Sequence, residues 1–107
     1  MVFLDVCPPA VIQRVESADL GSPANAMLFS DIAALAGLDC QVAAVPAVAD
    51  RLTARSHPQV IDDFCTSVAT YAGFLEPAAL GRVRAAYRRI PYSPLYAHSY
   101  FAGLRLT

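Results

Sequence analysis

The chain has 107 residues, of which eight are basic and nine acidic, so its formal net charge is −1. This length is typical of one domain, and we expect a single helical domain over residues 1–107. The balanced charge argues against a general nucleic-acid binder, which carries a basic surface. Hydrophobic residues make up 56% of the chain, against roughly 45–50% in ordinary soluble domains. We therefore expect another chain, a second copy included, to cover part of the apolar surface.

Proline and glycine mark where most of the predicted helices begin and end. Proline fits the first helical turn because the N–H that it lacks has no partner there, and glycine fits just beyond the last turn. A first helix is expected over residues 9–20 and a second over residues 23–36. The second is apolar on nearly all sides, which is typical of a helix at the centre of a fold.

The segment after Gly37 allows two interpretations. Asp39 is placed to cap a short turn over residues 40–45, and Pro46 then begins a helix that reaches residue 55. The alternative is a strand over residues 40–45 that pairs with the apolar residues 2–6.

Three further helices are predicted over residues 58–72, 77–90 and 94–102. The first of them has the clearest amphipathic pattern, with Phe64 and Val68 on its apolar side, and Ser56 and Gln59 have capping-box spacing before it. The sequence thus predicts an all-α compact bundle of five or six short helices, with the helices at 23–36 and 58–72 in the centre.

The three cysteines, Cys7, Cys40 and Cys65, are an odd number at wide spacing. This favours free thiols in a reducing compartment, and residues 1–20 lack a signal-peptide pattern, so we expect a cytoplasmic protein. His57 and His98 are not within four residues of each other or of a cysteine, whereas metal ligands usually come in close pairs. We therefore predict no metal site. We also predict no cofactor, small-molecule substrate, catalytic residue or membrane association.

One short segment, Arg14-Val15-Glu16-Ser17, contains a Glu-Ser pair that resembles that of the lysozyme-like lytic transglycosylases. In that family the glutamate is the general acid, so the resemblance implies this role for Glu16. It covers four residues, and the glycine-rich and Gly-Leu-Met-Gln-type segments of the family are missing downstream. An enzyme is therefore the third function class, after two binding functions.

The C-terminal third carries the residues that we expect to bind a partner. Arginines cluster on the helix at 77–90, and half of the ten aromatic residues fall within residues 87–101. Tyrosine and arginine are enriched in the energetic centres of interfaces. The predicted partner-binding residues are Arg84, Arg88, Arg89, Tyr92, Tyr96, Tyr100 and Phe101.

These observations favour a non-enzymatic protein-interaction or regulatory module of the inhibitor, immunity, adaptor or accessory-subunit type. Its expected partners are a protein and a second copy of itself. The alternative is a DNA-binding regulator in which residues 58–90 form a helix-turn-helix, with the helix at 77–90 reading DNA through Arg82, Arg84, Arg88 and Arg89.

Overall fold

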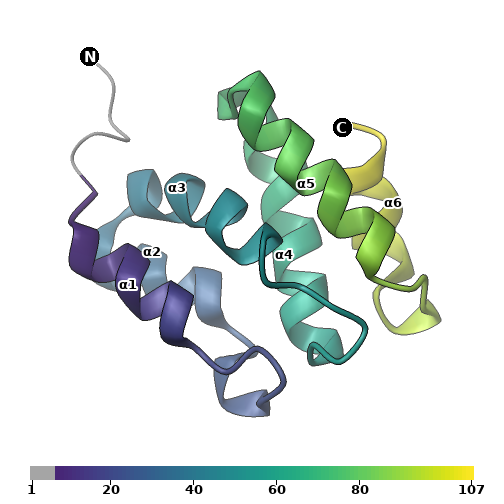
Figure 1. Cartoon of the computed structure of the whole chain (residues 1–107), viewed down its shortest axis with the longest axis horizontal. Coiled ribbons are helices and arrows are strands. Elements are labelled where there is room, and N and C mark those ends of the chain that lie inside the picture. The colour runs from purple at the N-terminus through teal and green to yellow at the C-terminus, as the bar shows by residue number, and fades with distance from the viewer. Residues whose placement is uncertain (1–6) are drawn as a thin grey trace.

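A computed structural model describes residues 7–107 and shows six α-helices with no strand in this range (Figure 1). The helices are α1 (Pro9–Ser17), α2 (Leu28–Ala36), α3 (Leu38–Ala49), α4 (Pro58–Tyr71), α5 (Pro77–Arg89) and α6 (Ala97–Leu104). Short 3₁₀ turns precede α2 and α6, η2 (Pro23–Asn25) and η4 (Pro94–Tyr96), and η3 (Ala72–Phe74) follows α4. The predicted all-α bundle is confirmed, and the predicted apolar segment at residues 2–6 lies outside the described residues.

The largest difference from the sequence prediction is in α3. Residues 40–45 are neither a turn nor a strand but part of one helix, which contains Pro46 near its end and stops at Ala49 rather than residue 55. An interior proline removes one hydrogen bond and costs about 3 kcal/mol. Burial compensates for this cost, since seven of the twelve residues of α3 are buried, including Val45 and Val48.

The centre of the bundle is formed by α3 and α4. The predicted central position of residues 58–72 agrees with the buried side of α4, where Phe64 and Val68 are fully inaccessible. The second central helix is α3 and not the segment 23–36, because α3 contacts α1, α2, α4 and α5. The segment 23–36 is divided instead into η2 and the shorter α2, with the break at Met27.

Side chains from neighbouring elements satisfy the backbone at several helix ends. Arg51 donates to the carbonyls of Val15 and Ala18, at 2.8 and 2.6 Å, and α1 ends at Ser17 instead of residue 20. His57, rather than Ser56, caps α4, because its Nδ1 accepts the hydrogen bond from the Gln59 N–H at 3.1 Å. Such caps replace the intrahelical partners that terminal backbone groups lack.

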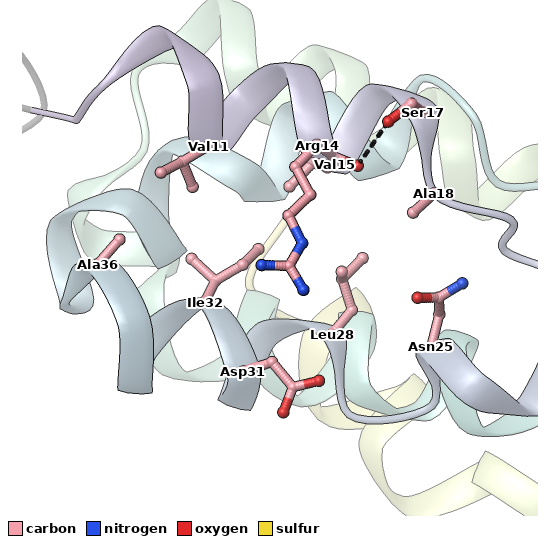
Figure 2. Close-up of a pocket in the computed structure, with 10 residues that line it drawn as sticks. All are labelled: Val11, Arg14, Val15, Ser17, Ala18, Asn25, Leu28, Asp31, Ile32 and Ala36. Atoms are coloured by element: carbon pink, nitrogen blue, oxygen red, sulfur yellow. Dashed lines mark hydrogen bonds between the residues drawn. The ribbon is translucent and has the colours of Figure 1, made fainter.

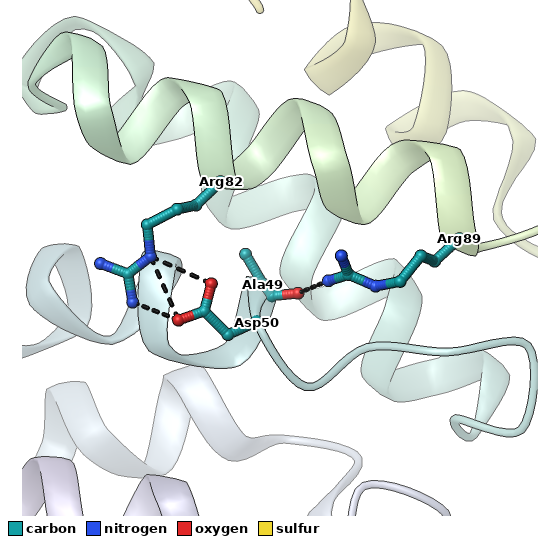
Figure 3. Close-up of polar contacts among 4 residues, drawn as sticks. All are labelled: Ala49, Asp50, Arg82 and Arg89. Atoms are coloured by element: carbon teal, nitrogen blue, oxygen red, sulfur yellow. Dashed lines mark hydrogen bonds and ion pairs between the residues drawn. The ribbon is translucent and has the colours of Figure 1, made fainter.

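Two arginines of α5 attach this helix to the end of α3 (Figure 3). Arg82 Nε donates to both carboxylate oxygens of Asp50, at 3.0 Å from Oδ1 and 3.1 Å from Oδ2. The hydrogen bonds from Arg82 are the main reason that the pKa of Asp50 lies below its usual value. Arg89 donates to the carbonyl of Ala49 and, at 3.1 Å, to that of Leu52. Positive charge near exposed carbonyls at a helix C-terminus is stabilising, so both side chains have a structural role.

A disulfide joins Cys7 to Cys40, and therefore connects the start of α1 to the first turn of α3. The prediction of free thiols is wrong for these two residues, because the α1–α3 packing brings together cysteines that are 33 residues apart. It is confirmed for Cys65, which is free and buried. The two pairing cysteines could not be selected from their spacing alone.

The bundle has principal extents of 37, 29 and 19 Å, and its two ends are built from different helices. In Figure 1, α1 and α2 lie at the left and α5 and α6 at the right, while α3 runs from the left, above α1, to the middle, where α4 lies. Over residues 7–107, every helix is too short or too polar to cross a membrane. The molecule thus has an α1–α2 end, formed by residues 7–39, and an α5–α6 end, formed by residues 77–107.

Candidate functional site

A shallow groove lies between α5 and α6, within the predicted partner-binding surface. Its volume is about 320 Å³, and it is lined by Arg84, Tyr87, Arg88, Tyr100, Leu104 and Thr107. Three of the predicted residues, Arg84, Arg88 and Tyr100, therefore come together at one place. They do so because one turn of α5 separates Arg84 from Arg88, and one turn of α6 separates Tyr100 from Leu104.

Aromatic rings form one continuous cluster beside this groove. The Tyr87 and Tyr100 ring centroids are 5.1 Å apart in an edge-to-face arrangement, and Tyr92 lies 5.7 Å from Tyr100. Phe101 lies 5.3 Å from Tyr92. These separations are in the range that aromatic pairs prefer. Tyr92 and Phe101 nevertheless keep 52% and 51% of their surface exposed, so their rings are held in place and remain accessible.

Tyr96 does not belong to this exposed surface. It is only 4% exposed, and its hydroxyl donates to the carbonyl of Pro91. An interface anchor must be accessible before the partner binds, and Tyr96 fails that condition. Its position follows from η4, which turns the chain back against α4 and places the ring in the core.

The predicted arginines also divide into two groups. Arg89 is engaged at the end of α3, as described above, and is a structural residue. Arg84 Nε donates to the main-chain oxygen of Thr107 at 2.6 Å, and no acidic side chain of residues 7–107 forms an ion pair with Arg84 or Arg88. These two exposed side chains present their positive charge at the edge of the groove. For the DNA-binding alternative, only two of the four arginines on α5 remain uncommitted to α3.

The distribution of charge along the chain is a sequence signal that the prediction missed. Residues 77–107 contain five of the eight arginines and none of the nine acidic residues. On the neighbouring α4, the half-buried Asp62 accepts a hydrogen bond from Ser99. The α5–α6 end is consequently basic in a protein of almost zero net charge, and a charge count by segment would have revealed this.

A second hollow, the α1–α2 cleft, lies at the opposite end of the molecule (Figure 2). Its volume is about 220 Å³, and Val11, Val15, Leu28 and Ile32 supply apolar walls. Figure 2 shows the Arg14 side chain reaching across the cleft from α1 toward α2, where Asp31 lies. The sequence did not predict this cleft, because its lining depends on how α1 packs beside α2.

The side chains considered for catalysis or metal binding are buried, cap a helix or lie on the surface. Burial raises the pKa of the Cys65 thiol to about 11, which keeps it protonated near neutral pH. His57 caps a helix, while His98 and Glu16 are exposed. Within residues 7–107, no three histidine, cysteine or acidic side chains are grouped as metal ligands would be.

One acidic residue has a structural role with a shifted pKa. Asp63 on α4 accepts a hydrogen bond from the Phe29 N–H at 2.9 Å, and therefore caps the first turn of α2. Its partial burial raises the carboxyl pKa to about 6, although the hydrogen bond from Phe29 opposes this shift. Asp62 and Asp31 contribute smaller increases through their charges. Asp63 thus connects the central helix α4 to the α1–α2 end.

Comparison of the chain with protein-family models, with curated proteins and with solved structures gave no significant match.

Proposed function

We propose that this protein is a non-enzymatic interaction module that binds a protein partner through its α5–α6 end. The proposal rests on one observation. Eight large hydrophobic side chains are exposed among those that the structure describes, which are those of residues 7–107 except Leu35, and five of them fall between residues 92 and 106: Tyr92, Leu95, Phe101, Leu104 and Leu106. A concentration of exposed apolar side chains on a small protein is typical of an interaction surface.

The chemistry of this surface supports a protein as the partner. Aromatic residues and arginine are enriched in the centres of protein interfaces, and here Tyr92 and Phe101 lie beside Tyr100, near Arg84 and Arg88. The rings would supply most of the affinity, and the arginines at the rim would select acidic partners and accelerate association. We include a second copy of the chain among the partners, in keeping with its high apolar content.

The DNA-binding alternative has less support from the same residues. Arg82 and Arg89 contact the end of α3, so only two of the four α5 arginines are available to bind the phosphate backbone of DNA. Binding to phosphates also weakens steeply as the salt concentration rises, whereas contacts made by aromatic side chains do not. Titration of a DNA duplex at two salt concentrations distinguishes the two functions.

We place the protein in an oxidising compartment instead of the cytoplasm that the cysteine spacing favoured. The Cys7–Cys40 disulfide is the reason, since disulfides persist in oxidising surroundings and are rare in the cytosol. Mass spectrometry of alkylated protein from the native host tests this assignment. We expect alkylation of Cys65 alone after unfolding, and alkylation of all three cysteines would contradict it.

The proposal is tested by removing the exposed rings and measuring assembly. We expect sedimentation velocity to show a dimer or larger species for the wild type, and a monomer for the double variant Tyr92→Ala with Phe101→Ala. Both proteins should keep the same helical circular dichroism and cooperative melting.

The variant Phe74→Ala is a matched control, because Phe74 is an exposed ring on η3, away from α6. It should assemble as the wild type does. If the double variant assembles like the wild type, the α5–α6 end is not the binding surface. A wild type that is monomeric at every accessible concentration would remove the second copy as a partner.

A further inference from the structure

We propose that copies of this chain associate head to tail, with the α5–α6 end of one copy docked on the α1–α2 end of the next. This inference rests on the proposed function, because the α5–α6 end is the binding surface in both. It goes further by naming the occupant of that surface, which is the acidic and hollow end of a second copy.

The first argument is the charge of the two ends. Residues 7–39 contain one arginine, Arg14, and four acidic residues: Glu16, Asp19, Asp31 and Asp39. Arg51, which lies against the end of α1, adds a second positive charge, so the acidic residues outnumber the arginines by four to two at this end. Three of these carboxylates, those of Glu16, Asp19 and Asp31, are on exposed residues. The opposite end carries arginines and no acidic side chain over residues 77–107. Opposite charges attract across an interface, while like charges placed together disfavour it. The ends therefore complement each other.

The second argument is the shape of the two ends. The α1–α2 cleft is a hollow of about 220 Å³ with apolar walls, and the α5–α6 end has exposed apolar side chains. An apolar cavity of about 150 Å³ is large enough to hold benzene, so the cleft has room for the ring of Phe101. The guanidinium of Arg14 lies across the cleft in Figure 2 and would contact such a ring through its face.

The third argument is that the symmetric alternative is electrostatically unfavourable. A two-fold dimer through the α5–α6 ends would bring together two surfaces that carry arginines, without any acidic side chain from residues 77–107. A head-to-tail contact instead joins two different surfaces, so each copy keeps one end of each kind. Repetition of such a contact gives a ring or an open chain.

Two charge-reversal variants and their mixture test the proposal. The basic-end variant carries Arg84→Glu and Arg88→Glu, and the acidic-end variant carries Glu16→Arg and Asp31→Arg. We expect each variant alone to associate roughly 100-fold more weakly than the wild type, because like charges then face each other. An equimolar mixture of the two should regain association, because the unchanged acidic end of one variant fits the unchanged basic end of the other.

The control variant is Ala54→Glu, which adds a charge on an exposed residue of the loop between α3 and α4. It should associate as the wild type does, and circular dichroism should show that all variants are folded. Sedimentation velocity measures association in each case. Loss of association in the acidic-end variant is specific to a head-to-tail contact, because Glu16 and Asp31 take no part in a symmetric dimer of the α5–α6 ends.

The outcomes separate this inference from the proposed function. If only the basic-end variant loses association, whatever the mixture does, the α5–α6 end is a binding surface but the α1–α2 end is not its partner, which overturns the inference. If the basic-end variant associates as well as the wild type, the head-to-tail contact is overturned, whereas the proposed function is decided by the Tyr92→Ala, Phe101→Ala double variant. A wild type that stays monomeric at low salt and high concentration also overturns the inference.

Discussion

The two ends of this molecule are built on the same pair of central helices and have opposite character. At the α1–α2 end, nine-residue helices leave an apolar cleft between them, and four carboxylates lie within residues 7–39. At the α5–α6 end, a shallow groove is bordered by a cluster of aromatic rings, some of which remain exposed, and by Arg84 and Arg88, which form no ion pair with an acidic side chain of residues 7–107. The core between them has the ordinary composition of a helical bundle, so the features that distinguish this protein are at its ends.

The largest effect on stability is expected for Phe64 of α4, whose ring packs against Tyr87 of α5. Phe64 is fully buried, and its ring centroid is 6.3 Å from that of Tyr87. Phe64→Ala should lower the free energy of unfolding by about 3–5 kcal/mol, which is enough to unfold many domains of this size. Phe101→Ala should lower it by only about 1 kcal/mol, because the ring is half exposed and contacts Tyr92 and Tyr100. Urea denaturation measures both, and equal losses would contradict the division between core and surface.

The contact between α5 and α6 depends on a glycine. A Cβ at Gly103 would lie 2.2 Å from the Tyr87 hydroxyl oxygen and 3.0 Å from the carbonyl oxygen of Cys65. Gly103→Ala should therefore destabilise the protein by about 1–3 kcal/mol. Gly81, within α5, has open space around its Cβ position, so Gly81→Ala should stabilise by about 0.5–1 kcal/mol. Thermal melts that shift in the same direction for both variants would show that α6 is placed differently.

The arginines of α5 should have unequal effects on stability. Arg89→Ala removes hydrogen bonds to the carbonyls of Ala49 and Leu52, and we expect a loss of about 1–2 kcal/mol. Arg84→Ala, at the groove, should cost less than about 0.5 kcal/mol while weakening association. Denaturation and sedimentation of the two variants give this contrast, and a larger stability loss for Arg84→Ala would reverse the assignment.

The smallest effect concerns Asp63, which caps the α1–α2 end. Because burial raises its pKa to about 6 in the folded protein, above its ordinary value, its contribution to stability is full at acid pH. That contribution is lost as the pH rises through about 6. Asp63→Asn keeps an oxygen that accepts from Phe29 and removes this pH dependence. It should exceed the wild type by about 1 kcal/mol above pH 7, after allowance for solvent screening.

Urea denaturation at pH 4 and pH 7.5 measures the effect of Asp63→Asn. Asp63→Ala, which loses the cap, should instead be less stable than the Asn variant by about 1 kcal/mol at both pH values. A wild type and an Asn variant with the same change between the two pH values would show that the Asp63 carboxyl is not desolvated.

Helix positions could be predicted because their signals are local. Proline at Pro58 and Pro77 and the periodic apolar residues of 58–72 identify α4 and α5 to within one residue. Pro46 misled the prediction because a local helix breaker was outweighed by the burial of α3 against four other helices. That gain comes from tertiary packing and has no signature near Pro46.

The site could be predicted only in part, for the same reason. The sequence locates the aromatic and basic residues in the C-terminal third, but it does not separate exposed Tyr92 from buried Tyr96, which lie four residues apart, before and at the end of η4. Arg89 and Arg88 are adjacent in the chain, yet only Arg89 reaches the end of α3. The cleft and the Cys7–Cys40 disulfide depend on contacts between distant segments. By contrast, the basic character of residues 77–107 was visible in the sequence.

Backbone amide hydrogen exchange at low and high protein concentration tests the central claim most directly, which is that a second copy of the chain covers the α5–α6 end. We expect slower exchange at high concentration in α6 and the adjoining part of α5, with a matching change in α1 and α2, and no change in α4. Exchange that is independent of concentration throughout residues 7–107, or a change confined to η3 and α3, would contradict the account.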